Sequence, residues 1–146
     1  MNWALPAYEG MITGDQFGNF DTREIGRRLY RMLDDFYCDD EVFGRIIIEK
    51  DFETNYASLD ALRNVVMFPV YALLVDYGDK SATVHDRLYS ARPVRMGDGT
   101  TRIFTRKEAD DVFYRALRSE GIANWRAAMF YTGVRFGGES SFHKEK

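Results

Sequence analysis

The segment that starts at Thr105 constrains the fold more than any other part of the chain. Thr105 and Glu108 fit a capping box, in which each side chain accepts a backbone N–H at the start of a helix. Apolar residues then recur at the spacing of one helix face, at Ala109, Val112, Phe113, Ala116 and Leu117. Gly121 can end this helix in a left-handed conformation. The segment therefore predicts an amphipathic helix whose apolar face must pack against other elements.

An earlier helix carries the chain's candidate chemical groups. His85 and Tyr89 are four positions apart and share one helix face, while Asp86 projects about 100° away from His85. This helix should end near Arg92–Pro93, because the residue before a proline is pushed out of the helical conformation. The predicted helix at 105–117 could lie against it and present Asp110 to His85.

A last helix is expected from about Asn124 to Gly137–Gly138. Its predicted common face contains Trp125, Ala128, Met129, Thr132 and Phe136. Shorter helical segments are expected at 58–67 and 70–75, on either side of Pro69. The helical half of the chain should therefore hold three to five helices.

Strand patterns precede these helices. Leu29, Arg31 and Leu33 alternate along the chain with Tyr30 and Met32, as in a strand. Asp34–Asp35 can form a turn, and residues 36–38 resume the strand pattern. Residues 42–49 contain the run Ile46-Ile47-Ile48, which predicts a central strand buried on both faces. A small antiparallel meander should result.

A β-hairpin is expected between the His85 helix and the helix after Thr105. Residues 94–96 and 101–103 flank Gly97-Asp98-Gly99, a turn sequence that suits a short hairpin. Strands followed by helices define an α+β class, with this hairpin inserted in the helical half.

The chain length of 146 residues suits a single domain. We expect an extended N-terminal arm at residues 1–25, one α+β domain at 26–138 and a polar C-terminal tail at 139–146. The arm contains Trp3, Tyr8, Phe17 and Phe20, which make it too apolar for a free tail. It should pack either on its own domain or on a neighbouring subunit.

Composition excludes several classes of protein. A net charge of −3 and a pI near 5.4 offer no basic surface for nucleic acid, so we expect no nucleic-acid partner. We also expect no signal peptide and no transmembrane segment, since no apolar stretch reaches about eighteen residues. The single Cys38 cannot form an internal disulfide and should be a small apolar strand residue.

The His85 helix suggests acid–base chemistry. A carboxylate that holds a histidine fixes its tautomer and stabilises the imidazolium, so His85 is the candidate base and Asp110 the candidate orienting residue. Tyr89 can hydrogen-bond to Asp110. Asp86 is a candidate calcium ligand, and no other cofactor is expected. With no Gly-x-Ser-x-Gly motif in the chain, any hydrolysis should use activated water.

A structural alternative competes with this chemistry. His85 can instead be a buried histidine that joins two helices, with Asp110 and Tyr89 completing a polar network. Spacing alone favours this alternative. Arg135 could pair with a carboxylate such as Asp86, which would also favour a structural network over a metal site.

Four motifs follow one another along the domain. They are Ile46 to Leu59, with Phe52-Glu-Thr-Asn-Tyr-Ala-Ser58; His85-Asp-Arg-Leu-Tyr89; Ala109-Asp-Asp-Val-Phe113; and Met129 to Gly137. In this order they resemble the phage and prophage family called domain of unknown function 1353 (DUF1353). The resemblance spans roughly residues 29–137 and leaves the arm unexplained.

Two further comparisons of motifs affect the expected function. Asn55 and Leu59–Asp60 depart from the family's loop, where an Asp and an aliphatic-Pro pair are usual, so any cation or substrate bound there should bind more weakly. His85-Asp86-x-x-Tyr89 facing Asp110 is similar to the core of secreted and viral phospholipases A2. That similarity implies water activation by His85, calcium at Asp86 and orientation of His85 by Asp110.

Two functional hypotheses result. The first is a bacteriophage virion structural protein, a tail, neck or baseplate-associated subunit on a hydrolase-like scaffold, made in the host cytoplasm and located in the virion. Its partners would be other virion proteins, bound through the arm and the tail in an oligomeric assembly. The alternative is a calcium-assisted His/Asp hydrolase that acts on phospholipid or cell-envelope material during infection or lysis. A combination of the two is a virion subunit whose former site only stabilises the fold.

Overall fold

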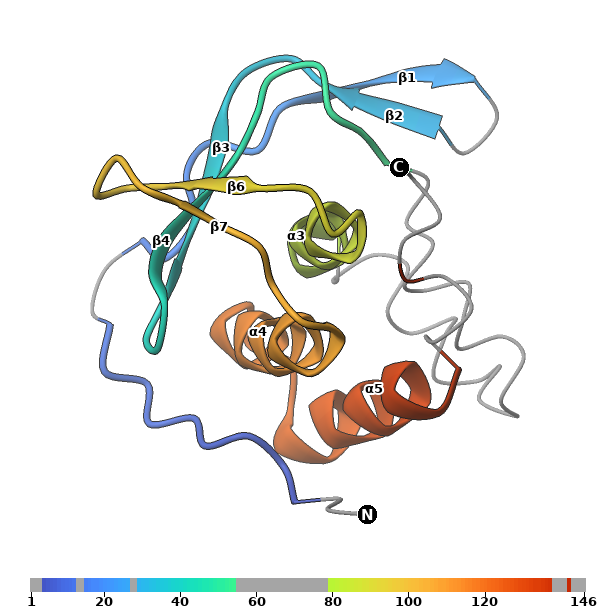
Figure 1. The fold of residues 1–146 in the computed structure, drawn as a ribbon. Helices are drawn as coiled ribbons and strands as arrows, with labels where there is room; N and C mark the ends of the chain where they lie inside the picture. Colours follow the sequence, from blue (N-terminus) through green and yellow to red (C-terminus); the bar gives the residue numbers. More distant parts are fainter. Residues whose placement is uncertain (1–3, 13–14, 27–28, 55–78, 138–141, 143–146) are drawn as a thin grey trace.

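Two antiparallel sheets and three helices make up the described part of the computed structural model, which comprises residues 4–12, 15–26, 29–54, 79–137 and 142 (Figure 1). The strands are β1 (Thr22–Gly26), β2 (Leu29–Met32), β3 (Phe36–Asp40), β4 (Gly44–Ile48), β5 (Glu53–Thr54), β6 (Val94–Met96) and β7 (Thr101–Arg102). The helices are α3 (Asp79–Tyr89), α4 (Arg106–Ser119) and α5 (Asn124–Gly137). The predicted α+β class is confirmed, and so is the hairpin β6–β7 between α3 and α4.

The strands divide into a sheet of order β1-β2-β5 and a sheet of order β3-β4-β6-β7. The expected turn at Asp34–Asp35 separates β2 from β3, so the predicted meander is divided between the two sheets. Strand β1 was not predicted and begins at Thr22, within the segment expected to be the arm. Strand β5 was also not predicted; it lies in the motif before Asn55 and pairs with β2.

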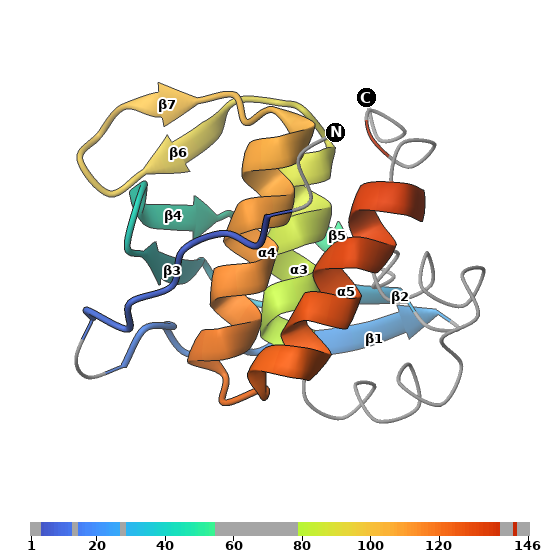
Figure 2. The same ribbon diagram turned by 90° about the horizontal axis from the view of Figure 1, so that it is seen from below.

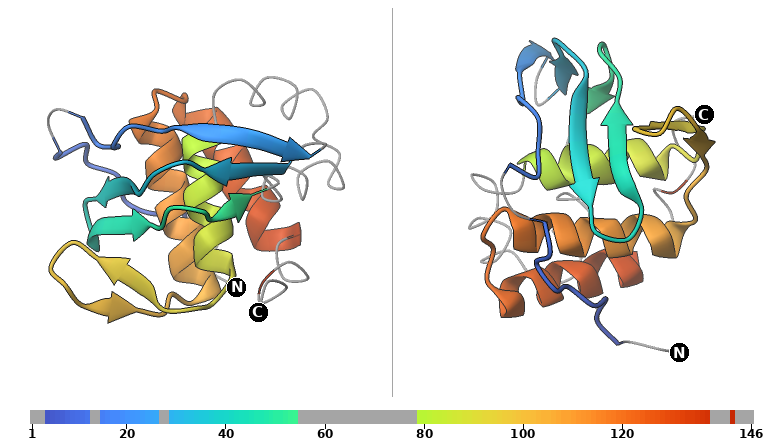
Figure 3. Two further views of the ribbon diagram at one scale, coloured as in Figure 1. Left: turned by 90° about the horizontal axis from the view of Figure 1, so that it is seen from above. Right: turned by 90° about the vertical axis from the view of Figure 1, so that its left-hand side faces the viewer.

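Strand β4 is central in its sheet, but the prediction that both its faces are buried was wrong. Ile46 and Ile48 are fully buried, whereas Ile47 between them is only half-buried. The helices cover one face of the sheets (Figure 3), so alternate residues of β4 face the core. A short β-branched run occurs in strands that are buried on one face as well as in strands that are buried on both, so the run alone does not separate the two cases.

Helix α4 lies between α3 and α5 (Figure 1), and the three helices lie together on one side of the strands (Figure 2). Both halves of the predicted capping box are present: the Glu108 N–H donates to Thr105 Oγ at 3.1 Å, and the Thr105 N–H donates to the Glu108 carboxylate at 3.0 Å. Gly121 follows the helix with a φ of 88°. The Ile122 N–H then donates to the Leu117 carbonyl, which completes a Schellman motif.

Two apolar clusters meet at α4. The first lies between the sheets and the helices and includes Phe36, Ile46 and Leu88. The second lies between α4 and α5 and includes Phe113 and Phe130.

No described helix is long and apolar enough to span a bilayer.

The five residues expected on one face of α5 do share one side of the helix, but this is not the side that packs on α4. The buried side chains of α5 are Ala127, Phe130, Tyr131 and Val134, whereas Trp125 and Phe136 are 55% and 61% exposed. Apolar residues occur almost all around this helix, so periodicity alone does not show which side packs on α4.

Helix α3 ends at Tyr89, three residues before the predicted end at Arg92. The buried Arg87 guanidinium donates to Ser90 Oγ and to the carbonyls of Arg92 and Pro93, and it pairs with Glu49 at 2.8 Å. These contacts hold the chain in an irregular path after α3.

Three expected features lie outside the described residues. They are the helices at 58–67 and 70–75, the loop from Asn55 to Asp60 and, apart from Phe142, the tail at 139–146.

The described part of the arm packs on its own domain. The Phe17 and Phe20 rings lie 5.9 and 5.1 Å from the Phe36 ring, between centroids. Backbone hydrogen bonds join Gly18 N to the Tyr37 carbonyl and Asp39 N to the Gln16 carbonyl. The arm, blue in Figure 1, therefore covers the outer edge of β3.

Candidate functional site

Helices α3 and α4 bring three of the predicted site residues together. Nε2 of His85 lies 2.7 Å from Oδ1 of Asp110, and the Tyr89 hydroxyl donates to the same oxygen at 2.5 Å. His85 and Tyr89 share a face of α3 because they are one helical turn apart. The arrangement expected from the sequence, with Asp110 opposite His85 and bonded to Tyr89, is present.

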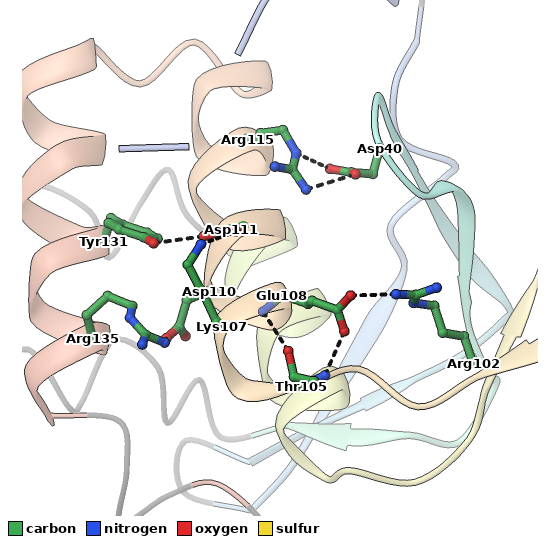
Figure 4. A network of polar contacts seen from close by, with 10 residues as sticks. All are labelled: Asp40, Arg102, Thr105, Lys107, Glu108, Asp110, Asp111, Arg115, Tyr131 and Arg135. Atoms are coloured by element: carbon green, nitrogen blue, oxygen red, sulfur yellow. Dashed lines mark hydrogen bonds and ion pairs between the residues drawn. The ribbon is translucent and has the colours of Figure 1, made fainter. Parts of the chain in front are cut away.

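Helix α5 adds a fourth member to this group. Arg135 donates from Nη1 to Oδ2 of Asp110 at 2.8 Å (Figure 4). Arg135 thus pairs with a carboxylate, as expected, but the partner is Asp110 and not the suggested Asp86. No local sequence signal distinguishes the two carboxylates, because the choice depends on how α5 packs against α4.

The His85–Asp110 pair is buried among aromatic rings. Both residues are 0% exposed. The His85 ring centroid lies 4.6 Å from that of Phe113 and 4.0 Å from that of Tyr89, and the Phe142 ring meets Tyr89 edge-on. A buried carboxylate in such surroundings is costly unless charged or polar partners surround it, as they do here.

The partners of Asp110 decide its charge. Burial raises the pKa of the Asp110 carboxyl, but hydrogen bonds from His85, Tyr89 and Arg135 together outweigh burial, so the pKa lies below its ordinary value. Burial and the neighbouring Asp110 charge raise the pKa of the Tyr89 phenol. At neutral pH the group therefore contains an ionised Asp110 and a protonated Tyr89.

This charge state assigns the hydrogen on His85. A carboxylate can only accept hydrogen bonds, so Nε2 of His85 is the donor to Asp110 and carries the hydrogen. In a neutral imidazole the lone pair then lies on Nδ1. Any proton that the neutral ring accepts would therefore be bound at Nδ1.

Asp86, the candidate calcium ligand, is also buried. Thr54 of β5 donates its hydroxyl hydrogen to Oδ2 of Asp86. Thr54 was not predicted as a site residue, although it belongs to the loop motif that precedes Asn55. No group of three or more His, Cys, Asp or Glu side chains that could hold a metal occurs among the described residues. Within the described part of the chain, Asp86 therefore belongs to no group of metal-binding side chains.

A second buried ion pair has a structural role. Arg115 of α4 donates from Nε and Nη2 to the two Asp40 oxygens at 2.8 and 3.1 Å (Figure 4). Asp40 also accepts the backbone N–H groups of Val42 and Phe43. The pair joins α4 to the β3–β4 turn, and the sequence offered no sign of it because 75 positions separate the partners.

The fold and the site define an α+β protein whose three described helices meet at a buried His-Asp-Tyr-Arg group. The chain belongs to the family described as "Protein of unknown function (DUF1353)", which matches residues 30–134. The resemblance inferred from the four motifs is thus confirmed. The match includes His85, Asp86, Tyr89 and Asp110 and ends one residue before Arg135. No curated protein and no solved structure matches the chain.

Proposed function

We propose that the chain is a hydrolase in which His85 activates water and Asp110 orients His85. The observation that supports the proposal is the 2.7 Å contact between Nε2 of His85 and an Asp110 carboxylate whose pKa is lowered. Such a carboxylate holds the histidine in the tautomer with its hydrogen on Nε2, so that Nδ1 is the nitrogen that accepts a proton, and it stabilises the imidazolium that forms. Tyr89 and Arg135 keep the carboxylate in place.

The proposed reaction needs one base and one water molecule. Nδ1 takes a proton as the water oxygen attacks an acyl ester carbon, which gives a tetrahedral oxyanion. When the ester C–O bond breaks, the imidazolium returns the proton to the leaving alkoxide, so the products are a carboxylic acid and an alcohol. The similarity of His85-Asp86-x-x-Tyr89 to the phospholipase A2 core makes phospholipid or other cell-envelope material the proposed substrate. Asp86 is the residue that would contribute to calcium binding.

Burial sets a condition on this reaction. His85 is 0% exposed and lies between the rings of Tyr89 and Phe113. Turnover therefore requires water and the ester to reach the Nδ1 edge of the ring, and an apolar acyl chain is the kind of group that such aromatic surroundings accept.

His85→Asn tests the proposal. The wild-type protein should hydrolyse phospholipid vesicles or purified cell-envelope fractions, assayed with calcium and with a calcium chelator. His85→Asn should lower the rate by about 100-fold or more, because it removes the base. The matched control is His143→Asn, which changes the chain's other histidine and should leave the rate unchanged. Circular dichroism shows whether each variant is folded.

Two experimental results would contradict the hydrolase proposal. A folded wild-type protein that releases no product from either substrate, with or without calcium, contradicts it. So does a folded His85→Asn variant that keeps the wild-type rate.

We also propose that the chain is a structural subunit of a bacteriophage particle, at the tail, neck or baseplate. The resemblance to a phage and prophage family supports this proposal. A surface observation adds to it: Met11 of the arm and Val42 of the β3–β4 turn are 70% and 62% exposed. Both lie beside Glu41, whose carboxylate accepts the Met11 N–H. Exposed apolar side chains gathered at one place are typical of a surface that a partner covers.

Mass spectrometry of purified particles tests the subunit proposal. The chain should be present at a fixed ratio to the major virion proteins, and Met11→Ser with Val42→Ser should lower that ratio. Absence of the chain from intact particles contradicts the proposal. The two proposals are compatible, because a particle subunit can also hydrolyse envelope material.

A further inference from the structure

Helix α5 differs in charge from the rest of the chain. The protein has a net charge of −3, whereas residues 124–137 contain two arginines and neither Asp nor Glu. Any anionic partner would therefore meet a locally positive element on an acidic protein.

The side of α5 that faces away from α4 is apolar. Trp125 and Phe136 are eleven residues apart, which corresponds to about three turns, so they point in nearly the same direction. They are 55% and 61% exposed. Ala128, Met129 and Thr132 lie between them on this side and are half-buried. These five residues form what we call the α5 stripe, about 16 Å long.

Two arginines flank the α5 stripe on opposite sides. Arg126 is about 100° and Arg135 about 280° from Trp125 around the helix. The Arg126 guanidinium lies 5.0 Å from the centroid of the Trp125 ring, and no ion pair joins it to another residue in the described part of the chain. A tryptophan with an adjacent cation combines an apolar surface with an attraction for anions.

We propose that the α5 stripe binds the surface of an anionic phospholipid membrane. A helix that lies in the membrane interface places its apolar side among the acyl chains and its basic residues at the level of the lipid phosphates. Tryptophan is enriched at this depth because its ring is apolar and its N–H is polar. Trp125, Phe136 and Arg126 meet these requirements, whereas Arg135 remains paired with Asp110.

A second copy of the chain fits the α5 stripe less well. A symmetric contact would place two antiparallel α5 helices together, with Arg126 of each copy close to Arg135 of the other. Like charges would then meet within the interface, which costs free energy. The stripe is also one helix wide, far less than the roughly 800 Å² per partner of a standard protein interface.

The α5 stripe lies next to the candidate site. Arg135, at its edge, contacts Oδ2 of Asp110 at 2.8 Å, and Asp110 contacts His85. A bilayer bound at α5 would therefore be separated from the His85–Asp110 pair by a single side chain. The inference extends the hydrolase proposal by naming a membrane as the substrate surface, but membrane binding itself requires no turnover.

Tryptophan fluorescence of Trp3→Phe protein tests the proposal, because Trp125 is then the only tryptophan. Vesicles of phosphatidylglycerol and phosphatidylcholine should shift its emission to shorter wavelength and should sediment with the protein. Phe136→Ser should weaken vesicle binding by roughly tenfold. Arg126→Gln should weaken it by about fivefold on these vesicles and have no effect on pure phosphatidylcholine vesicles.

Two matched controls alter similar side chains elsewhere. Ile103→Ser removes an apolar side chain that is 60% exposed, and Arg23→Gln removes an exposed charge from β1; neither should change binding. The proposal is overturned if vesicles do not bind, or if the two α5 variants bind as well as these controls. It is also overturned if Phe136→Ser abolishes a dimer seen by sedimentation velocity, since a second copy would then cover the stripe.

Failures of the two proposals are distinguishable. His85→Asn should bind vesicles like wild type while losing hydrolysis. Hydrolysis of a soluble short-chain ester without vesicle binding would overturn only the membrane inference, whereas vesicle binding without any hydrolysis would overturn only the hydrolase proposal.

Discussion

At the scale of single residues, Asp110 belongs both to the candidate site and to the contacts that hold the three helices together. Its two oxygens accept three hydrogen bonds, from His85 and Tyr89 on α3 and from Arg135 on α5. A buried carboxylate without these donors would cost several kcal/mol, so Asp110 and its partners are stable only as a group. Any substitution in the group should therefore affect both the stability of the protein and the tautomer of His85.

Asp110→Asn should lower the free energy of unfolding by about 3 kcal/mol at pH 7, because Arg135 then loses its carboxylate partner. The lowered pKa means that the unfolded protein binds a proton at Asp110 at a higher pH than the folded protein does. The stabilisation is thus complete above the ordinary pKa of 3.8 and is lost as the pH falls through the folded value. The difference in the free energy of unfolding between wild type and Asp110→Asn should therefore shrink as the pH falls.

Urea denaturation from pH 7 to the acid range measures this difference. Asp98→Asn is a suitable control, because hydrogen bonds from Thr100 also lower the Asp98 pKa but the carboxyl lies at the surface. Its effect should be much smaller at every pH. A difference for Asp110→Asn that stays constant as the carboxyl becomes protonated would contradict the assigned charge state.

At the scale of elements, α4 organises the domain. It packs against both α3 and α5, supplies residues to both apolar clusters and contributes Asp110 to the site. Its ends are fixed locally, by the Thr105–Glu108 capping box and the left-handed Gly121. Residues close together in the chain thus fix the ends of α4, the helix against which α3 and α5 pack.

Thr105→Ala should destabilise the protein by about 1 kcal/mol, because it leaves the Glu108 N–H at the start of α4 without its side-chain acceptor. Thr105→Ser retains the hydroxyl and should stay close to wild type. Thermal or urea denaturation of the two variants measures the difference. Equal losses in both variants would show that the threonine methyl group, and not the cap, matters.

The sequence predicted features that local physics decides. The α4 cap and the β6–β7 hairpin depend on residues close together in the chain, and the approach of His85 to Asp110 followed from helix phase and a motif resemblance. The buried side of α5 was not predictable, since it depends on which apolar stripe packs on α4. The Arg135–Asp110 and Thr54–Asp86 contacts join residues 25 and 32 positions apart and follow from tertiary packing alone.

At the scale of the whole molecule, the arm completes the larger sheet. Its backbone lies along the outer edge of β3, and Phe17 and Phe20 cover Phe36. Cys38 lies beneath the arm and is 2% exposed. Its backbone pairs with that of Phe17 in an isolated antiparallel β-bridge. Burial and the nearby Asp40 and Asp39 charges raise the pKa of the Cys38 thiol, which makes the thiol unreactive while the arm is in place.

Gly18→Val should displace the arm and expose Cys38. A Cβ atom at Gly18 would lie 2.6 Å from the Tyr37 ring, too close for the arm to keep its path. Cys38 should then react faster with Ellman's reagent than it does in the wild-type protein. Glu41→Ala is the control, because it removes the acceptor for Glu9 and Met11 but leaves Phe17 in place. Equal thiol reactivity in Gly18→Val and wild type would contradict the protective role of the arm.

The shared carboxylate of Asp110 has an evolutionary consequence. A descendant of this protein that lost its substrate would still need Asp110, His85 and Tyr89 to hold its helices together, so selection for folding alone would retain all three. Matching these residues in a related sequence therefore does not by itself distinguish an enzyme from a protein that only keeps the folded core. Under the proposed hydrolase function, residues that contact substrate without supporting the helices would be the first to change, and their identity would be the better guide to activity.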